Sequence, residues 1–130
     1  MNPPERFPPD DPREWMNRAR SNLALAKNRI PEAYLEDLCF EAQQAAEKAI
    51  KAVLITRGIE FPYVHDLNRL LALLEEAGEK IPETIRKAES LTTYAITTRY
   101  PSAGNPISLQ EYREALEIAK AVFQWAEERL

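Results

Sequence analysis

Residues 40–54 read FEAQQAAEKAIKAVL, and this stretch decides the fold class of the chain. Alanine, lysine and glutamate dominate it, and all three favour helices. Apolar residues recur at helical spacing over a wide part of its circumference. A helix that is apolar over so much of its surface belongs at the centre of a bundle, where small alanines let neighbours approach closely. The pattern predicts a central helix over about 35–57, ended by Gly58.

Four further segments have the same helical periodicity. They begin at Asp11, near His65, at Pro82 and at Ser108, and the one from Pro82 runs to about Arg99. Ser108 is followed three residues later by Glu111, the pattern of a capping box. The sequence contains no alternating apolar–polar strand of any length. We therefore expect an all-α fold, an up-and-down bundle of about five helices, four long and one short.

Length and composition are those of one small domain. The chain has 130 residues, of which 29% are charged, and its net charge is −4. Residues 1–10 are proline-rich and are expected to form a flexible arm, and residues 11–130 the helical domain. No run of about 18 apolar residues and no signal peptide occurs, so we expect no membrane contact and a cytoplasmic location.

The side-chain inventory narrows the chemistry. The chain has one cysteine, Cys39, and one histidine, His65, which excludes an intrachain disulfide and a zinc site built from these residue types. There is no glycine-rich phosphate loop and no acidic cluster, so we expect no metal and no cofactor. Cys39 lies in the alanine-rich pattern, where a small core residue is expected.

A second stretch, YAITTRYP at 94–101, completes a resemblance to a known family. Together with residues 40–54, the helix that carries Trp15 and the sequence His65-Asp66-Leu67, it is similar to the HEPN family, the higher eukaryote and prokaryote nucleotide-binding domain. The resemblance covers about residues 13–130. It implies an all-α bundle that is often dimeric and often encoded beside a minimal nucleotidyltransferase, as a toxin–antitoxin pair.

The resemblance also implies an activity, because many members are metal-independent ribonucleases. Their motif is an arginine followed four to six residues later by a histidine. Arg99 stands at the place of that arginine, but no histidine follows it. RNA cleavage needs a group that takes the 2′-OH proton, and an arginine, which stays protonated, can only hold phosphate.

Four residues are predicted to bind a nucleotide or RNA phosphate. Arg99 and Tyr100 suit a phosphate and a stacked base, and Gln44 and Lys48 share the side of the central helix that could reach them. The alternatives are a helix-ending cation at Arg99 and a solvated polar stripe on the central helix, with one Glu47–Lys51 ion pair.

His65 also has two interpretations. It could act as an acid–base group in catalysis, with its ring oriented by Asp66. Alternatively, the two residues only cap the third helix, with the Asp66 carboxylate accepting backbone N–H bonds.

Three functions follow from these patterns. The first is a nucleotide- or RNA-phosphate-binding component of a two-gene toxin–antitoxin-like system with a nucleotidyltransferase partner. The second is a ribonuclease toxin that uses Arg99 with an unconventional partner such as His65, and the third is a structural partner subunit without a ligand. A homodimer is expected, because the aromatic residues Trp15, Phe40, Tyr112 and Trp125 add to apolar faces that already exceed what one small bundle can hide.

Overall fold

The computed structural model describes residues 2–96, 101 and 106–130. The predicted site residues Arg99 and Tyr100 lie outside the described residues. Every regular element is a helix: α1 (Pro12–Lys27), α2 (Leu35–Thr56), α3 (Leu67–Glu76), α4 (Glu83–Arg86), the 3-10 segment η1 (Lys87–Leu91), α5 (Thr92–Ile96) and α6 (Leu109–Glu127). The described part of the chain contains no strand, and the all-α prediction is confirmed.

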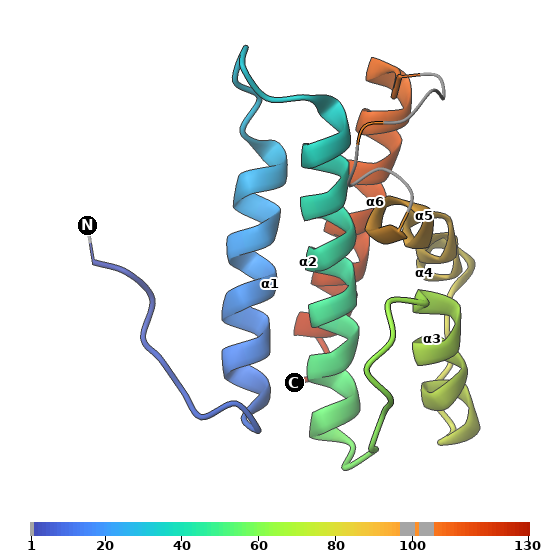
Figure 1. Cartoon of the computed structure of the whole chain (residues 1–130). Coiled ribbons are helices and arrows are strands. Elements are labelled where there is room, and N and C mark those ends of the chain that lie inside the picture. Colours follow the sequence, from blue (N-terminus) through green and yellow to red (C-terminus); the bar gives the residue numbers. More distant parts are fainter. Residues whose placement is uncertain (1, 97–100, 102–105) are drawn as a thin grey trace.

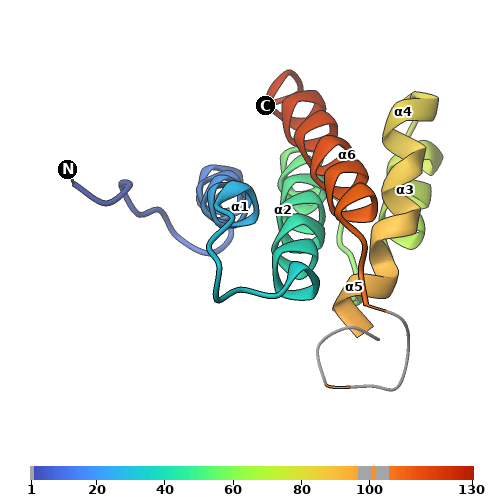
Figure 2. The same ribbon diagram turned by 90° about the horizontal axis from the view of Figure 1, so that it is seen from above.

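Helix α2 occupies the centre of the bundle, as its alanine-rich sequence predicted. Seen from above, α2 lies between α1 on one side and α6 and the α3–α5 segment on the other (Figure 2). Its small residues Ala42, Ala45, Ala46 and Ala49 are fully buried, and so is Ile50. The missing side-chain volume at these alanines lets helices from both sides approach the α2 backbone.

One connection departs from simple up-and-down order. Helices α1 and α2 are antiparallel, but residues 57–66 climb back along α2, so α3 runs in the same direction as α2 (Figure 1). The backbone N–H of Leu67 then donates to Thr92 Oγ1 (3.1 Å), which ties the start of α3 to α5. This return places His65 beside the middle of α2.

The local start and stop signals are confirmed. Asp11 caps α1 and Asp66 caps α3 through their carboxylates, and Ser108 forms the predicted capping box with Glu111. Gly58 ends α2 with a φ of 70°, a left-handed conformation in which glycine carries no Cβ penalty.

Three predicted details are wrong. The helix predicted from Pro82 is interrupted by η1, where Ser90 Oγ donates to the Lys87 carbonyl (2.8 Å) in a hydroxyl-to-backbone bond that often bends a helix. The helical spacing that begins at Trp15 and at Tyr112 predicts that Ile30 and Leu130 belong to the core, but each is 49% exposed. They lie beyond the last helical residues, where the chain no longer follows the helical period.

Other features match expectation or add to it. Cys39 is fully buried in the core, as predicted, and burial raises the pKa of its thiol to about 12. No helix in the described residues is both long and apolar enough to cross a bilayer.

Residues 2–10 lie outside the bundle beside α1, where the Asn17 side chain donates to the Glu5 carbonyl (2.8 Å).

Candidate functional site

The polar stripe of α2 lies inside the protein rather than in solvent. Gln43, Glu47 and Lys51 follow one another at four-residue intervals and therefore share one face of the helix. Their exposed fractions are only 0%, 4% and 5%. The alternative of a solvated stripe is therefore wrong for these three residues, although the predicted Glu47–Lys51 ion pair is present at 2.9 Å.

Glu47 is the centre of a hydrogen-bond network. Its Oε2 accepts from Lys51 Nζ (2.9 Å), and its Oε1 accepts from Gln43 Nε2 (2.9 Å) and lies 2.8 Å from His65 Nδ1. Burial by itself raises the pKa of Glu47, but the hydrogen bonds from Lys51, Gln43 and His65 outweigh it and lower that pKa below its usual value. The carboxylate is therefore ionised at neutral pH.

The network fixes the ring of His65. An ionised Glu47 accepts a hydrogen bond from Nδ1–H of the ring, which leaves Nε2 with a free lone pair in the neutral imidazole. The side chain of His65 is 52% exposed, whereas that of its partner Glu47 is 5% exposed. The half-exposed imidazole of His65 is thus hydrogen-bonded to the buried, ionised carboxylate of Glu47.

The orienting acid differs from the one expected. Asp66 Oδ1 accepts hydrogen bonds from the backbone N–H groups of Asn68 and Arg69. This carboxylate therefore caps α3, as the second interpretation of His65 and Asp66 predicted. Glu47, 18 residues before His65 in the chain, holds the ring instead. A polar i, i+4 set inside an otherwise apolar helix was the signal available in the sequence, but it does not reveal the histidine.

Lys51 is enclosed by aromatic rings. Its Nζ lies 5.8 Å from the centroid of Trp15 and 5.5 Å from that of Phe61. The two rings meet edge to face, with their centroids 6.2 Å apart. Cation–π contacts of this kind help offset the desolvation of a buried ammonium group.

Gln44 and Lys48, two of the predicted binding residues, contact different neighbours. Gln44 Nε2 donates to Gln43 Oε1 (2.7 Å) and so joins the Glu47 network. Lys48 Nζ donates to Asn22 Oδ1 of α1 (2.8 Å), and burial lowers the pKa of Lys48. Because Arg99 lies outside the described residues, its proximity to these two side chains stays a prediction.

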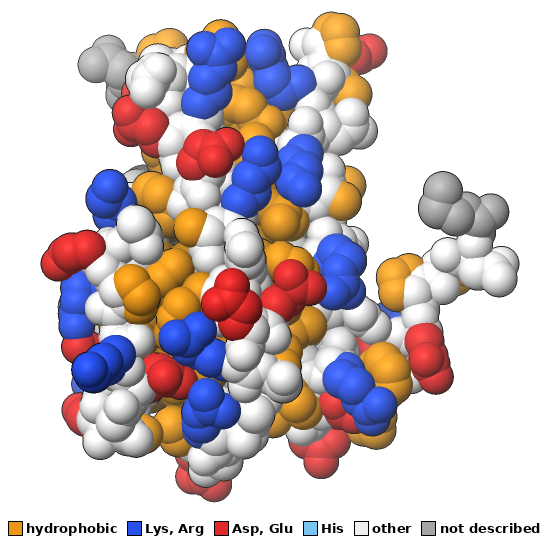
Figure 3. Space-filling model, turned by 180° about the vertical axis from the view of Figure 1, so that it is seen from behind, with side chains coloured by type: hydrophobic (Ala, Val, Ile, Leu, Met, Phe, Trp, Pro, Cys, Tyr) orange, Lys and Arg blue, Asp and Glu red, His pale blue; other side chains and the backbone are white. Residues whose placement is uncertain are grey.

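Two basic residues of α1, Arg13 and Arg20, are already paired with other groups. Arg13 pairs with Asp11, and Arg20 lies 3.4 Å from Glu127 and stacks over the Phe123 ring at 5.3 Å. On the face formed by α1 and α6, Lys and Arg side chains gather in the upper half, with hydrophobic side chains between them (Figure 3). Arg13 and Arg20, each beside an acidic side chain, are typical of a solvated surface.

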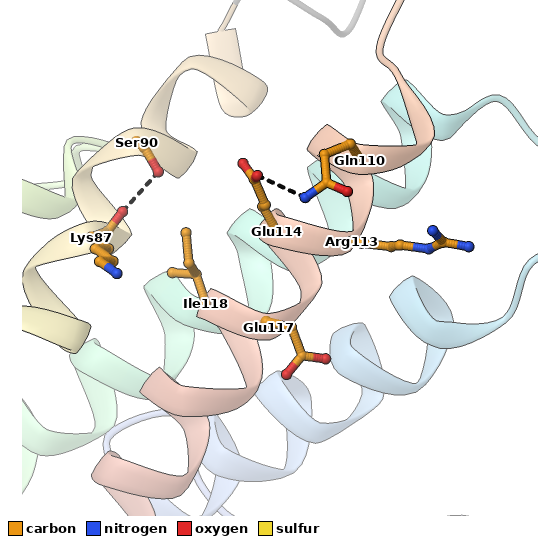
Figure 4. Close-up of a pocket in the computed structure, with 7 residues that line it drawn as sticks. All are labelled: Lys87, Ser90, Gln110, Arg113, Glu114, Glu117 and Ile118. Carbon is orange, nitrogen blue, oxygen red and sulfur yellow. Dashed lines mark hydrogen bonds between the residues drawn. The ribbon is translucent and has the colours of Figure 1, made fainter.

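A hollow of about 610 Å³ lies between η1 and α6. Two of its polar side chains bond nearby groups: Gln110 Nε2 donates to Glu114 (2.9 Å), and Ser90 donates to the Lys87 carbonyl. The Arg113 side chain extends away from the other lining residues (Figure 4). No set of polar groups converges on this space, and we assign it no chemistry.

Within the described residues, no three His, Cys, Asp or Glu side chains lie together in a way that could hold a metal ion. Among the described residues, the Glu47–His65 pair is therefore the arrangement best suited to proton transfer or to binding an anion. It can bind or move a proton at Nε2, and it can donate a hydrogen bond to an anion when the ring is protonated.

The HEPN domain family model matches residues 12–129, nearly the whole chain. This chain belongs to the HEPN domain family. The family implied by residues 40–54 and 94–101 is therefore confirmed.

Two solved structures share the fold of this HEPN chain. TT1696 from Thermus thermophilus is 35% identical and superposes with a TM-score of 0.81, covering 92% of this chain and 98% of its own. ST0689, described as an archaeal HEPN homologue, is 27% identical with a TM-score of 0.75, covering 92% and 97%.

A curated relative carries a functional name. The protein named "Putative toxin MJ1304", from Methanocaldococcus jannaschii, is 31% identical over 93 residues, which is 67% of this chain. The matched part spans 61% of the length of that relative.

Proposed function

We propose that this toxin-like HEPN protein binds RNA, or a nucleotide, through its phosphate on the face that carries His65. The observation that carries the proposal is the Glu47–His65 pair, in which an ionised, buried carboxylate holds a half-exposed imidazole. A buried charge network adds little to stability compared with apolar packing of the same volume. Titratable groups with shifted pKa values, linked to a side chain that reaches the surface, are typical of functional sites.

The binding residues of the proposal are those predicted from the sequence. Arg99 would hold phosphate and Tyr100 would stack on a base, with Gln44 and Lys48 on the same side of α2. In its support, Gln44 is hydrogen-bonded into the network that holds His65. The protein would act with a nucleotidyltransferase partner in a two-gene toxin–antitoxin-like system.

The Glu47–His65 pair also favours a second candidate function, metal-independent RNA cleavage. The free Nε2 of His65 would take the proton of a ribose 2′-OH, and the resulting 2′-oxygen would attack the adjacent phosphorus. The bond from phosphorus to the 5′-oxygen would break, and that oxygen would take a proton from water. Glu47 would stabilise the imidazolium that forms, and Arg99 the charge on phosphate.

One RNA experiment separates these functions. A labelled single-stranded RNA would be incubated in EDTA with the wild type and with Arg99→Ala, His65→Ala and Lys120→Ala, the last as an exposed-cation control. Arg99→Ala should weaken binding by about 10- to 100-fold, or about 1.5–3 kcal/mol, the range for a charge-assisted phosphate contact.

The outcomes bear on each function separately. Cleavage that is lost in both Arg99→Ala and His65→Ala would establish the ribonuclease. Binding without cleavage would support the binding protein, and unchanged binding in Arg99→Ala would favour a structural subunit without ligand. Lys120→Ala should match the wild type in each assay.

We also propose a homodimer. The aromatic residues expected to be in excess do not require one, since Tyr112 and Trp125 are buried within a single chain. Support comes instead from the last turn of α1 and the connection that follows it, where Leu25, Ile30 and Tyr34 are 51%, 49% and 75% exposed. Light scattering should give twice the chain mass of 14.9 kDa, and a monomer at every concentration would contradict the proposal.

A further inference from the structure

The N-terminal arm lines part of a second hollow, on the side of α2 that carries Lys48. It measures about 380 Å³, and its walls come from the arm, α1 and α2. The residues that line it are Phe7, Pro9, Glu14, Trp15, Arg18 and Lys48. The volume falls in the range of small-ligand sites, and the lining combines aromatic rings with two cations.

The two cations are arranged to accept an anion. Lys48 donates to the neutral amide of Asn22 and forms no ion pair within the described residues. Arg18 binds Glu14 through Nε alone (2.7 Å), and its side chain is 56% exposed. Burial lowers the pKa of Lys48, the charges of Glu41 and Glu47 oppose that shift, and the smaller effect of the Arg18 charge adds to it.

The acid in the wall does not cancel these cations. Glu14 Oε1 accepts the backbone N–H of Phe7 (2.9 Å), and Oε2 accepts Arg18 Nε and lies 4.0 Å from Arg6. Its single negative charge is therefore shared between two arginines. The charged residues of the lining itself, Glu14, Arg18 and Lys48, sum to one positive charge, and Arg6 lies beside Glu14.

The aromatic wall is held in place. Trp15 Nε1 donates to the Pro9 carbonyl (2.7 Å), which fixes the indole ring and fastens the arm to α1. The Arg13 guanidinium lies 4.1 Å from the centroid of Phe7, and this contact holds the Phe7 ring of the arm against α1. A fixed indole offers a stacking surface for a base of any sequence, and such stacking contributes substantially to single-strand binding.

The hollow is connected to the histidine site through one residue. Lys51 Nζ bonds Glu47, which holds His65, and the same ammonium lies over the Trp15 ring. We infer that the hollow is a ribonucleotide subsite, in which Arg18 and Lys48 hold the phosphate and Trp15 stacks on the base. The inference rests on the proposed function. The nucleotide in the hollow and the nucleotide beside His65 would be neighbours in the same RNA, with Lys51 between them.

Tryptophan fluorescence with adenosine 5′-monophosphate as the probe tests the subsite. Stacking should quench the Trp15 emission in a saturable manner, and Trp15→Phe, which keeps the buried Trp125, should remove the quenching. Lys48→Gln and the double variant Arg18→Gln/Lys48→Gln should raise the apparent Kd by about 10-fold or more. Arg20→Gln and Lys120→Gln are matched controls and should leave the Kd unchanged.

Lys48→Gln removes no ion pair among the described residues, so the fold should survive, and circular dichroism would verify this for every variant. Saturable quenching that disappears with the two cations supports the subsite. No quenching, or quenching that the cation variants leave unchanged, overturns it. Inorganic phosphate should compete with the nucleotide, but more weakly because it lacks the base.

The RNA assays on the same preparations keep the two proposals distinguishable. RNA binding that depends on Arg99, without nucleotide quenching, would overturn the subsite and leave the proposed function standing. Cation-dependent quenching in a protein that neither binds nor cleaves RNA would support a nucleotide subsite and overturn the RNA function.

Discussion

Helices α2 and α6 are the two longest in the protein, and they use the core in different ways. The buried residues of α6 are all apolar or aromatic, and its charged side chains lie on the opposite face. Helix α2 is buried over much of its circumference, and its buried set includes Gln43, Glu47 and Lys51. In α6, hydrophobicity alone explains which side faces inward. In α2, polar residues are inside because partner groups meet them there.

The comparison shows that burial has two different energetic bases in one small bundle. Apolar residues of α6 gain free energy by leaving water. Glu47 and Lys51 lose hydration on burial, and their mutual attraction offsets this free-energy cost only as long as each keeps its partner. The two helices should therefore respond differently to the removal of one side chain.

The largest effect is expected from breaking the buried pair. Glu47→Ala leaves the Lys51 ammonium buried without its carboxylate, which should cost about 3–5 kcal/mol in the free energy of unfolding. The matched control is Glu117→Ala on α6, which removes an exposed i, i+3 pair with Lys120 and should cost at most about 0.5 kcal/mol. Urea denaturation measures both, and equal costs would show that the α2 pair is hydrated.

The apolar face of α6 is tested by Phe123→Ala. The ring is 9% exposed and lies under the Arg20 guanidinium, so we expect a loss of about 3 kcal/mol, at the lower end for a core phenylalanine. Thermal and urea unfolding would report the change. A loss below about 1 kcal/mol would mean that this stripe does not pack against the core.

The helix starts differ as well. Ser108→Ala removes the capping box of α6 and should cost about 1 kcal/mol. Helix α2 begins at Leu35, and its N-cap residue Tyr34 forms no side-chain cap hydrogen bond, so Tyr34→Ser should instead stabilise the protein, by about 0.5 kcal/mol. Opposite signs in urea unfolding are the expected result, and a stabilising Ser108→Ala would contradict the role of the cap.

The finest test uses the pH dependence of unfolding. The folded pKa of Glu47 is lowered from 4.5, so the unfolded chain takes up this proton first as pH falls. The stabilisation is complete above the unfolded value and is lost as pH falls through the folded one. Glu47→Gln should therefore flatten the acid part of the stability curve, whereas Glu117→Gln should not. An unchanged acid slope in Glu47→Gln would argue against an ionised, hydrogen-bonded carboxylate.

The sequence by itself determined the long helices and several of their caps, and the order of its motifs indicated the family. Helices and caps depend on residues within about four positions of one another, as in Asp11 and the N–H of Arg13, or Ser108 and Glu111. The stripe around Gln44 and Lys48 was also visible, because helical spacing shows which side chains share a face.

Only the tertiary structure decided which face meets which neighbour. Periodicity cannot show that residues 57–66 return along α2, and that return brings His65 to Glu47 across 18 positions. It also cannot show that Trp15 and Phe61 close over Lys51, which makes a charged stripe a buried one. The physical reason is that a helical pattern records the direction of side chains around one axis, whereas burial and pairing depend on the distance between axes and on the path of the loops that join them.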